Sequence, residues 1–182
     1  MFLHGQETIP DLLISCEKPD LLISCEKVVS VNLQYSGKEK IPAGVETVWA
    51  FVTSPEKLGR CFPDVVDVTV QDPTHLEAIV KVGVGPVRGK FKVKGEIRPD
   101  PSRHRIDLTM TRGGFGSAID LTAGADLIDA GDGTTLLKWS GQAVARGPIA
   151  AVGGRVLDSE AKKLIEKAFS NIRQQLTTTS AT

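Results

Sequence analysis

The chain has 182 residues, the size of one ordinary domain, which is long enough to bury a substantial apolar core. Lysine plus arginine equals aspartate plus glutamate at 22 each, so no net charge draws the protein toward nucleic acid or an acidic membrane surface. No stretch reaches the roughly 18 consecutive apolar residues of a membrane span, and the N-terminus lacks the basic start and unbroken apolar run of an export signal. We therefore expect a cytoplasmic protein.

The three cysteines are Cys16, Cys25 and Cys61, and no two of them form a CxxC pair. No histidine lies beside them at a spacing typical of zinc ligands. This pattern argues against both a metal site and a disulfide framework. We expect Cys61 to act as a small buried apolar residue.

Residues 10–18 and 19–27 carry the same sequence, PDLLISCEK, in tandem. Two copies of so short a period are too few to stack into a repeat fold, and a proline opens each copy and would interrupt a helix. Two interpretations remain open. The segment is either a docking or pairing element in which Cys16 and Cys25 bridge, or a disordered leader, which includes an extension upstream of the true translation start. Either way we place residues 1–30 outside the folded domain.

The domain begins with a strand and two short helices. From Val31 the sequence alternates, with Val31, Leu33 and Tyr35 on one face and polar residues on the other, which predicts a half-buried strand. Apolar residues then recur at helical spacing over 45–52. The run 54–56, Ser-Pro-Glu, is typical of a helix N-cap followed by proline at the first helical position.

Between residues 64 and 145 almost every segment alternates with period two, and pairs rich in glycine and proline mark the turns. Six consecutive strands without intervening helices predict an antiparallel meander. Small residues at inward positions would let the sheet bend or leave room inside. These residues are Ala78, Gly89, Ala123, Gly141 and Ala143.

An apolar stripe over residues 149–176 predicts one long helix, about 40 Å in length at 1.5 Å per residue. The pair Gly153-Gly154 would allow close approach or a slight bend near its start. Such a helix needs a whole sheet as its partner. We therefore predict an α+β domain over residues 31–178, followed by a tail at 179–182, in which the helix closes a curved antiparallel seven-stranded sheet around an apolar interior.

This order of elements is that of the helix-grip architecture of START and Bet v 1-like proteins, and local motifs sharpen the match. The run Gly85-Pro86-Val87-x-Gly89-x-Phe91 is the most specific, because its glycines and proline fix a hairpin between two strands. Further motifs are Ile41-Pro42-Ala43, Val48-Trp49-Ala50-Phe51, Ser54-Pro55-Glu56-Lys57-Leu58, Cys61-Phe62-Pro63, Gly113-Gly114-Phe115-Gly116-Ser117-Ala118, Gly133-Thr134-Thr135-Leu136, and Gly153 with Leu157. From Val31 onward the chain resembles CoxG, a family of carbon monoxide dehydrogenase subunits within the SRPBCC superfamily.

The resemblance implies a helix-grip fold with a cavity beneath the long helix. It also implies an accessory, noncatalytic role beside a molybdenum hydroxylase of the carbon monoxide dehydrogenase type, either carrying a quinone- or lipid-like ligand or recruiting the enzyme to a membrane. Members of the family often carry a C-terminal segment suited to membrane attachment, whereas this chain ends in TTTSAT. We therefore expect membrane contact to be peripheral at most, and no covalently bound cofactor.

We expect the ligand to contact inward-facing apolar side chains and one arginine. Arg112 continues the inward parity of its strand to the cavity mouth, where it would meet a polar ligand head. Aromatic residues make up only 5% of the chain, so we expect them to fill a strongly bent sheet incompletely. The expected lining is Trp49, Phe62, Phe91, Met110, Arg112, Phe115, Trp139, Val152 and Val156.

Two other functions remain open. An enzyme of the cyclase, dehydratase or hydrolase type would use His104 or Arg112 to polarise a carbonyl inside the cavity, and a second ionisable group facing His104 across the cavity would favour it. An adaptor with a vestigial cavity would instead dock a partner through the N-terminal leader or through a basic strand face that otherwise serves as a solvated outer surface. That face consists of Arg88, Lys90, Lys92 and Lys94.

Overall fold

The structure is a computed structural model and describes residues 29–114 and 116–179. The tandem nonapeptides, with Cys16 and Cys25, and the predicted ligand contact Phe115 lie outside the described residues. The elements in chain order are β1 (Ser30–Ile41), α1 (Val45–Val52), α2 (Pro55–Cys61), β2 (Val65–Val70), β3 (His75–Val84), β4 (Val87–Asp100), β5 (Arg105–Gly114), β6 (Ser117–Asp129), β7 (Thr135–Arg146), α3 (Pro148–Ala151) and α4 (Gly154–Thr179).

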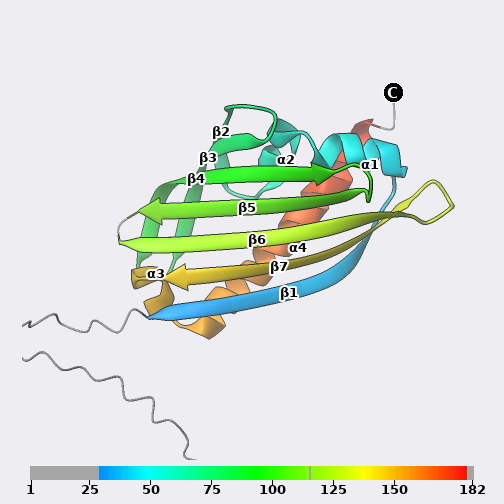
Figure 1. Cartoon of the computed structure of the whole chain (residues 1–182). Helices are drawn as coiled ribbons and strands as arrows, with labels where there is room; N and C mark the ends of the chain where they lie inside the picture. Colours follow the sequence, from blue (N-terminus) through cyan, green and yellow to red (C-terminus); the bar gives the residue numbers. More distant parts are fainter. Residues whose placement is uncertain (1–28, 115, 180–182) are drawn as a thin grey trace, which may run out of the picture.

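All seven strands form one antiparallel sheet in the order β1-β7-β6-β5-β4-β3-β2. The six later strands make the predicted meander, and β1 joins it beside β7. Figure 1 shows α4 crossing the strands diagonally on one face, with α1 and α2 toward one end of the sheet and α3 at the other. The predicted α+β helix-grip fold is confirmed.

Alternation along the strands separates an inward face from an outward one. In β4 the side chains of Phe91, Val93 and Ile97 are buried, whereas those of Lys92 and Lys94 between them are exposed. A period of two places successive side chains on opposite faces of a sheet. The face toward α4 is therefore apolar and the other face is hydrated.

The C-terminal helix differs from the prediction of a continuous element over 149–176. The chain forms the short helix α3, breaks at Val152 and Gly153, and begins again as α4 at Gly154. Gly153 has φ +100°, a backbone conformation that only glycine adopts readily. The glycine pair therefore interrupts the helix where the sequence predicted only a slight bend.

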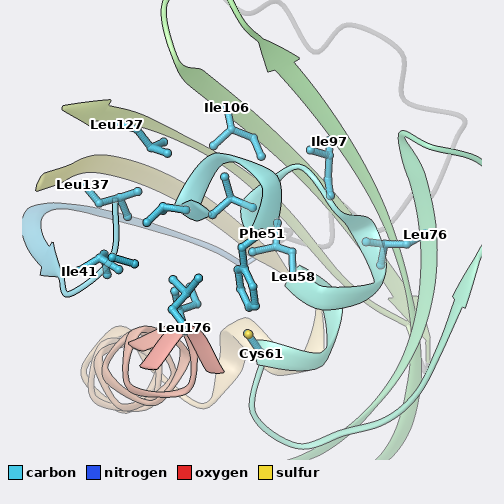
Figure 2. Packing of buried hydrophobic residues seen from close by; sticks show 14 of the residues in the cluster. Ile41, Phe51, Leu58, Cys61, Leu76, Ile97, Ile106, Leu127, Leu137 and Leu176 are labelled. Atoms are coloured by element: carbon cyan, nitrogen blue, oxygen red, sulfur yellow. The ribbon is translucent and has the colours of Figure 1, made fainter. Parts of the chain in front are cut away.

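Buried side chains form two separate cores. The larger one, the α1–α2 core, joins α1, α2 and the nearby strand ends to the end of α4, and includes Ile41, Phe51, Cys61, Ile97 and Leu176. Figure 2 shows Leu176 among these residues. The smaller one, the α3 core, consists of Ala145, Ile149 and Leu157 with partly buried neighbours. Each end of the interior therefore has its own apolar packing.

Cys61 is 1% exposed, and burial raises the pKa of its thiol to about 11. A thiol with a raised pKa stays protonated at neutral pH and is a poor nucleophile. The prediction that Cys61 acts as a small buried apolar residue is confirmed.

The position of α4 can be tested by truncating two of its leucines to alanine. Leu176 is 1% exposed in the α1–α2 core, whereas Leu164 is 45% exposed. Because truncation of a buried leucine leaves a cavity, we expect Leu176→Ala to lower the free energy of unfolding by about 2–5 kcal/mol. Leu164→Ala should change it by less than about 0.5 kcal/mol. Equal losses in urea unfolding would show that the helix face is assigned wrongly.

The break before α4 can be tested by replacing each of two neighbouring glycines with alanine. An alanine at Gly153 must adopt φ +100°, so Gly153→Ala should lower the free energy of unfolding by about 1–3 kcal/mol. Gly154 begins the helix, and a Cβ there would meet Val31 Cγ1 at an ordinary 3.8 Å. Gly154→Ala should therefore stabilise the protein by about 0.4–1 kcal/mol. Urea unfolding of both variants measures the two signs, and a neutral Gly153→Ala would contradict the break.

Candidate functional site

Polar links hold α4 along both of its edges. On one edge the hydroxyl of Tyr35 in β1 donates a hydrogen bond to Asp158 Oδ1 of α4 at 2.8 Å. On the other edge Asn171 Nδ2 of α4 donates to the backbone carbonyl of Cys61 in α2 at 2.9 Å. The helix is thus tied to the first strand and to the second helix.

The helix spans the sheet rather than lying on its middle. The α4 backbone comes closest to β1 and β3, which lie toward opposite edges of the sheet, and makes at most isolated close approaches to the central strands β4 to β7. Protein interiors are close-packed, so the volume between α4 and the central strands must be filled by side chains or by a ligand.

The side chains at the centre of that volume are less buried than those at its ends. The inward-facing residues at the centre of β5, β6 and β7 are only half-buried, although Ile106, Leu127 and Leu137 at one end and Ala145 at the other are 4–6% exposed. The apolar members of this central group belong to neither core. We name this group the concave middle; it consists of Met110, Arg112, Leu121, Ala123, Gly141 and Ala143.

The inner stripe of α4 shows the same pattern. Leu157 near its start and Ile172 near its end are buried, and Phe169 between them packs against the α1–α2 core. Three other residues between Leu157 and Ile172 on this stripe are half-buried and belong to neither core. These residues are Ala161, Ile165 and Ala168. The inward side chains of the helix and of the sheet are therefore buried most completely at the two ends of the interior and less completely in its middle.

Arg112 carries a charge into this interior. It shares the inward parity of Met110, and its guanidinium carbon lies 3.9 Å from the centre of the Phe91 ring, which is 3% exposed. Arg112 Nη2 is buried and has no hydrogen-bond partner among the described residues. Desolvation lowers the pKa of Arg112, but an arginine remains protonated. The site therefore holds a half-buried cation whose Nη2 is a buried, unused donor.

Trp139 supplies a second unused donor. Its ring lies 5.2 Å from the Phe169 ring of α4 at a tilt of 39°. It also packs against β1, because a Cβ built at Gly37 would lie 3.1 Å from the indole. Trp139 Nε1 is buried and has no hydrogen-bond partner among the residues that the structure describes. An indole N–H can only donate, so a ligand oxygen would satisfy it.

The two donors lie at opposite ends of the concave middle. Trp139 pairs with Ala125, which pairs with Ile106 of β5, so Ile106 marks the position of Trp139 along the sheet. Arg112 is six residues beyond Ile106, which corresponds to about 20 Å at about 3.3 Å per residue. One small polar head cannot contact both donors, whereas an elongated ligand can reach from one to the other.

The remaining expected ligand contacts are divided between the two cores. Trp49 and Phe62 are half-buried and pack against the α1–α2 core, and Val152 packs against the α3 core. Val152 also touches the hairpin between β3 and β4, since a Cβ at Gly85 would lie 3.2 Å from its Cγ1. These three residues flank the concave middle, in which Met110 and Arg112 lie.

The position of Val156 differs from the predicted lining. Its side chain is 44% exposed, so the interior position expected for it is wrong. The adjacent Leu157 is buried instead, at 6% exposure. Because α4 begins anew at Gly154, its inner stripe passes through Leu157, and Val156 lies beside that stripe at the surface.

His104 lies just outside β5, which begins at Arg105. It occupies a left-handed turn conformation (φ +47°) directly before β5, with its ring edge-on to Trp49 at 5.5 Å and Nε2 3.5 Å from Glu46 Oε1. The side chains of His104 and Glu46 are 40% and 85% exposed, and both line an open surface hollow of about 400 Å³. His104 and Arg112 lie at opposite ends of β5, so the two candidates of the enzyme hypothesis do not form one site.

The basic strand face points outward, as the alternation predicts. Lys92 pairs with Glu77 at 2.5 Å, and Lys94 lies 3.9 Å from the same carboxylate, whose pKa is lowered chiefly by its hydrogen bond with Lys92. Lys90 stands directly opposite Lys81 on β3. A shallow hollow of about 390 Å³ opens beside Lys92 and Lys94. This surface remains available to an acidic partner, as the adaptor hypothesis requires.

Two other features are absent from the described residues: a cluster of metal ligands and a helix able to cross a bilayer. Among residues 29–114 and 116–179, no three His, Cys, Asp or Glu side chains are grouped to hold a metal ion. In the same part of the chain, no helix combines the length and the apolar character that crossing a bilayer requires.

The link between Tyr35 and Asp158 predicts a pH dependence. Burial, together with the neighbouring carboxylate, raises the pKa of Tyr35 from 10.0 to about 12. A raised phenol pKa contributes stability that is complete below about pH 10 and is lost as pH rises toward about 12. Tyr35→Phe should therefore cost about 1 kcal/mol at pH 8 and less at pH 11. Urea unfolding measures the difference, and a cost that is equal at both pH values would contradict the link.

Comparisons with known proteins agree with this architecture. Residues 37–177 match the sequence model of CoxG, the family described as a subunit of carbon monoxide dehydrogenase. A conserved protein from Geobacillus kaustophilus is 24% identical, with a TM-score of 0.73, and the match covers 80% of this chain and 96% of that one. A START superfamily protein from Mycobacterium smegmatis is 13% identical, with a TM-score of 0.62 and coverage of 80% and 97%.

Norcoclaurine synthase from Thalictrum flavum, a point mutant in complex with a transition-state analogue, is 12% identical, with a TM-score of 0.59 and coverage of 84% and 98%. No curated protein matches the sequence at a significant level. At these identities the structural likenesses establish the fold. The match at 37–177 spans more than half of the sequence, and the chain therefore belongs to the CoxG family.

Proposed function

We propose that the protein binds a hydrophobic small molecule, quinone- or lipid-like, between α4 and the sheet, without catalysing a reaction on it. The observation that carries this proposal is the half-buried concave middle, which lies between two well-packed cores. If the interior were only a close-packed core, its central side chains would be the most completely buried. Here the central side chains are less buried than those at either end.

The chemistry of the interior supports an elongated apolar ligand. Methionine, leucine and alanine side chains face the inner stripe of α4, and the unused donors of Arg112 and Trp139 lie at the two ends. Each methylene group moved from water to such a site contributes about 0.8 kcal/mol. Ten methylenes would thus contribute roughly 8 kcal/mol before the cost of immobilising the ligand, which is enough for useful affinity.

The cellular role that we propose follows from family membership. A member of the CoxG family would serve a molybdenum hydroxylase of the carbon monoxide dehydrogenase type as an accessory protein that carries the ligand. It would act in the cytoplasm, with membrane contact at most peripheral. The basic outer face formed by Lys81, Lys90 and their neighbours would be available to the partner enzyme.

The test is to fill the interior with a larger side chain. Ala123 faces the concave middle, whereas its neighbour Thr122 is exposed on the outer face of the same strand. Solvent extraction and mass spectrometry of the native protein should recover a copurified lipid or quinone. Ala123→Phe should reduce its molar ratio to protein at least about tenfold, because the ring occupies the ligand volume. Thr122→Phe should leave the ratio unchanged.

Both variants must first show the circular dichroism spectrum of the unmodified protein. Native protein without an extractable ligand that also fails to take up added quinones and lipids would refute the proposal. Equal ligand content in the two phenylalanine variants would place the ligand elsewhere on the molecule.

A further inference from the structure

We infer that the interior selects ligands with an acidic head, which binds the guanidinium of Arg112 while the apolar tail extends along the concave middle toward Trp139. This inference rests on the proposed function and names the class of ligand: an amphiphile with a carboxylate or similar monoanionic head. Four features of the structure carry it.

The first feature is the missing counter-charge. Arg112 forms no ion pair among the described residues, and its Nη2 has no hydrogen-bond partner. Asp120, the acidic residue of β6 nearest to Arg112 in the strand register, is engaged outside the interior, where it pairs with Arg146. Burying an unpaired charge is far more costly than burying a neutral group of the same shape. A bound anion would remove this cost.

The second feature is the support of the guanidinium. Arg112 stacks on Phe91 at 3.9 Å, and Phe91 is almost fully buried, so the aromatic face is a fixed platform. Stacking of this kind holds the planar guanidinium in one orientation and leaves its N–H edge for an acceptor. A planar fork of this kind matches the two oxygens of a carboxylate.

The third feature is the path for the tail. Met110 lies next to Arg112 on the inward face of β5, and Leu121 stands opposite Met110 on β6. Beyond them the small side chains of Ala123 and Gly141 keep the middle open. Methionine adapts its shape readily to a ligand. An extended apolar tail therefore meets apolar surface for about 20 Å before it reaches the indole of Trp139.

The fourth feature is the difference between an acid and a neutral acceptor. A carbonyl or hydroxyl group would satisfy the Nη2 hydrogen bond but would leave the charge of Arg112 uncompensated. An anion supplies both the hydrogen bond and the counter-charge, and charge-assisted bonds are stronger than neutral ones. The site therefore discriminates in favour of the acid at equal chain length.

The experiment compares dodecanoate with dodecan-1-ol, which share a chain and differ in the head. The delipidated full-length protein is loaded with the neutral dye Nile red at pH 8, and each amphiphile is titrated to displace it. We expect dodecanoate to displace the dye at a concentration at least about tenfold lower. Arg112→Met should abolish this preference, and Arg112→Lys should retain part of it, because an ammonium keeps the charge but not the fork.

Arg88→Gln is the matched control, because Arg88 is exposed on the outer face of β4 and carries the same charge. This variant should keep the full preference for dodecanoate. A preference lost equally in the Arg88 and Arg112 variants would overturn the inference, since it would reflect attraction to the surface. Equal displacement by both amphiphiles in the unmodified protein would also overturn it while leaving the proposed function intact.

The stability of the ligand-free protein separates a binding role from a structural one. A cation kept for a ligand destabilises the empty protein, so the denaturant midpoint of Arg112→Met should equal or exceed that of the unmodified protein. A lower midpoint would make Arg112 structural and would overturn the inference. Failure of the unmodified protein to bind Nile red or either amphiphile would overturn the proposed function, and this inference with it.

Discussion

The attachment of α4 at its edges and ends is the constraint on which the interior depends. Tyr35 and Asn171 tie the helix to β1 and α2, and Leu176 and Leu157 anchor it in the two cores. With these positions fixed, the α4 backbone makes at most isolated close approaches to the central strands. We attribute the lower burial of the concave middle to this packing of the ends rather than to any single residue.

Charged side chains also differ between the surface and the interior. The ion pairs of the described residues lie on exposed or partly exposed surfaces, where they contribute little to stability. Arg112 differs, because it is turned inward over Phe91 and has a buried donor without a partner. A protein that retains such a group tolerates a loss of stability in its empty state. Binding an acidic ligand would recover that loss, and it gives the cation a function that packing alone does not explain.

Much of this fold could be predicted from the sequence, because strands that face a core on one side alternate with period two. The meander, the two short helices and the inward parity of Arg112 all follow from that alternation and from helical spacing. The break at Gly153 could not be predicted, since a glycine permits a left-handed conformation without requiring it. The exposure of Val156 follows from that break. The missing partners of Arg112 and Trp139 depend on contacts between distant strands, which one sequence does not reveal.

The most direct test of a ligand-binding interior is photo-crosslinking with an amphiphile that carries a diazirine in the middle of its tail, followed by peptide mapping. The account predicts crosslinks on the inward residues of β5 and β6, with Met110 and Leu121 foremost, and on Ile165 of α4. Excess unlabelled amphiphile should abolish them. Crosslinks confined to the outer face around Lys90, or to the surface hollow beside His104, would contradict the central claim.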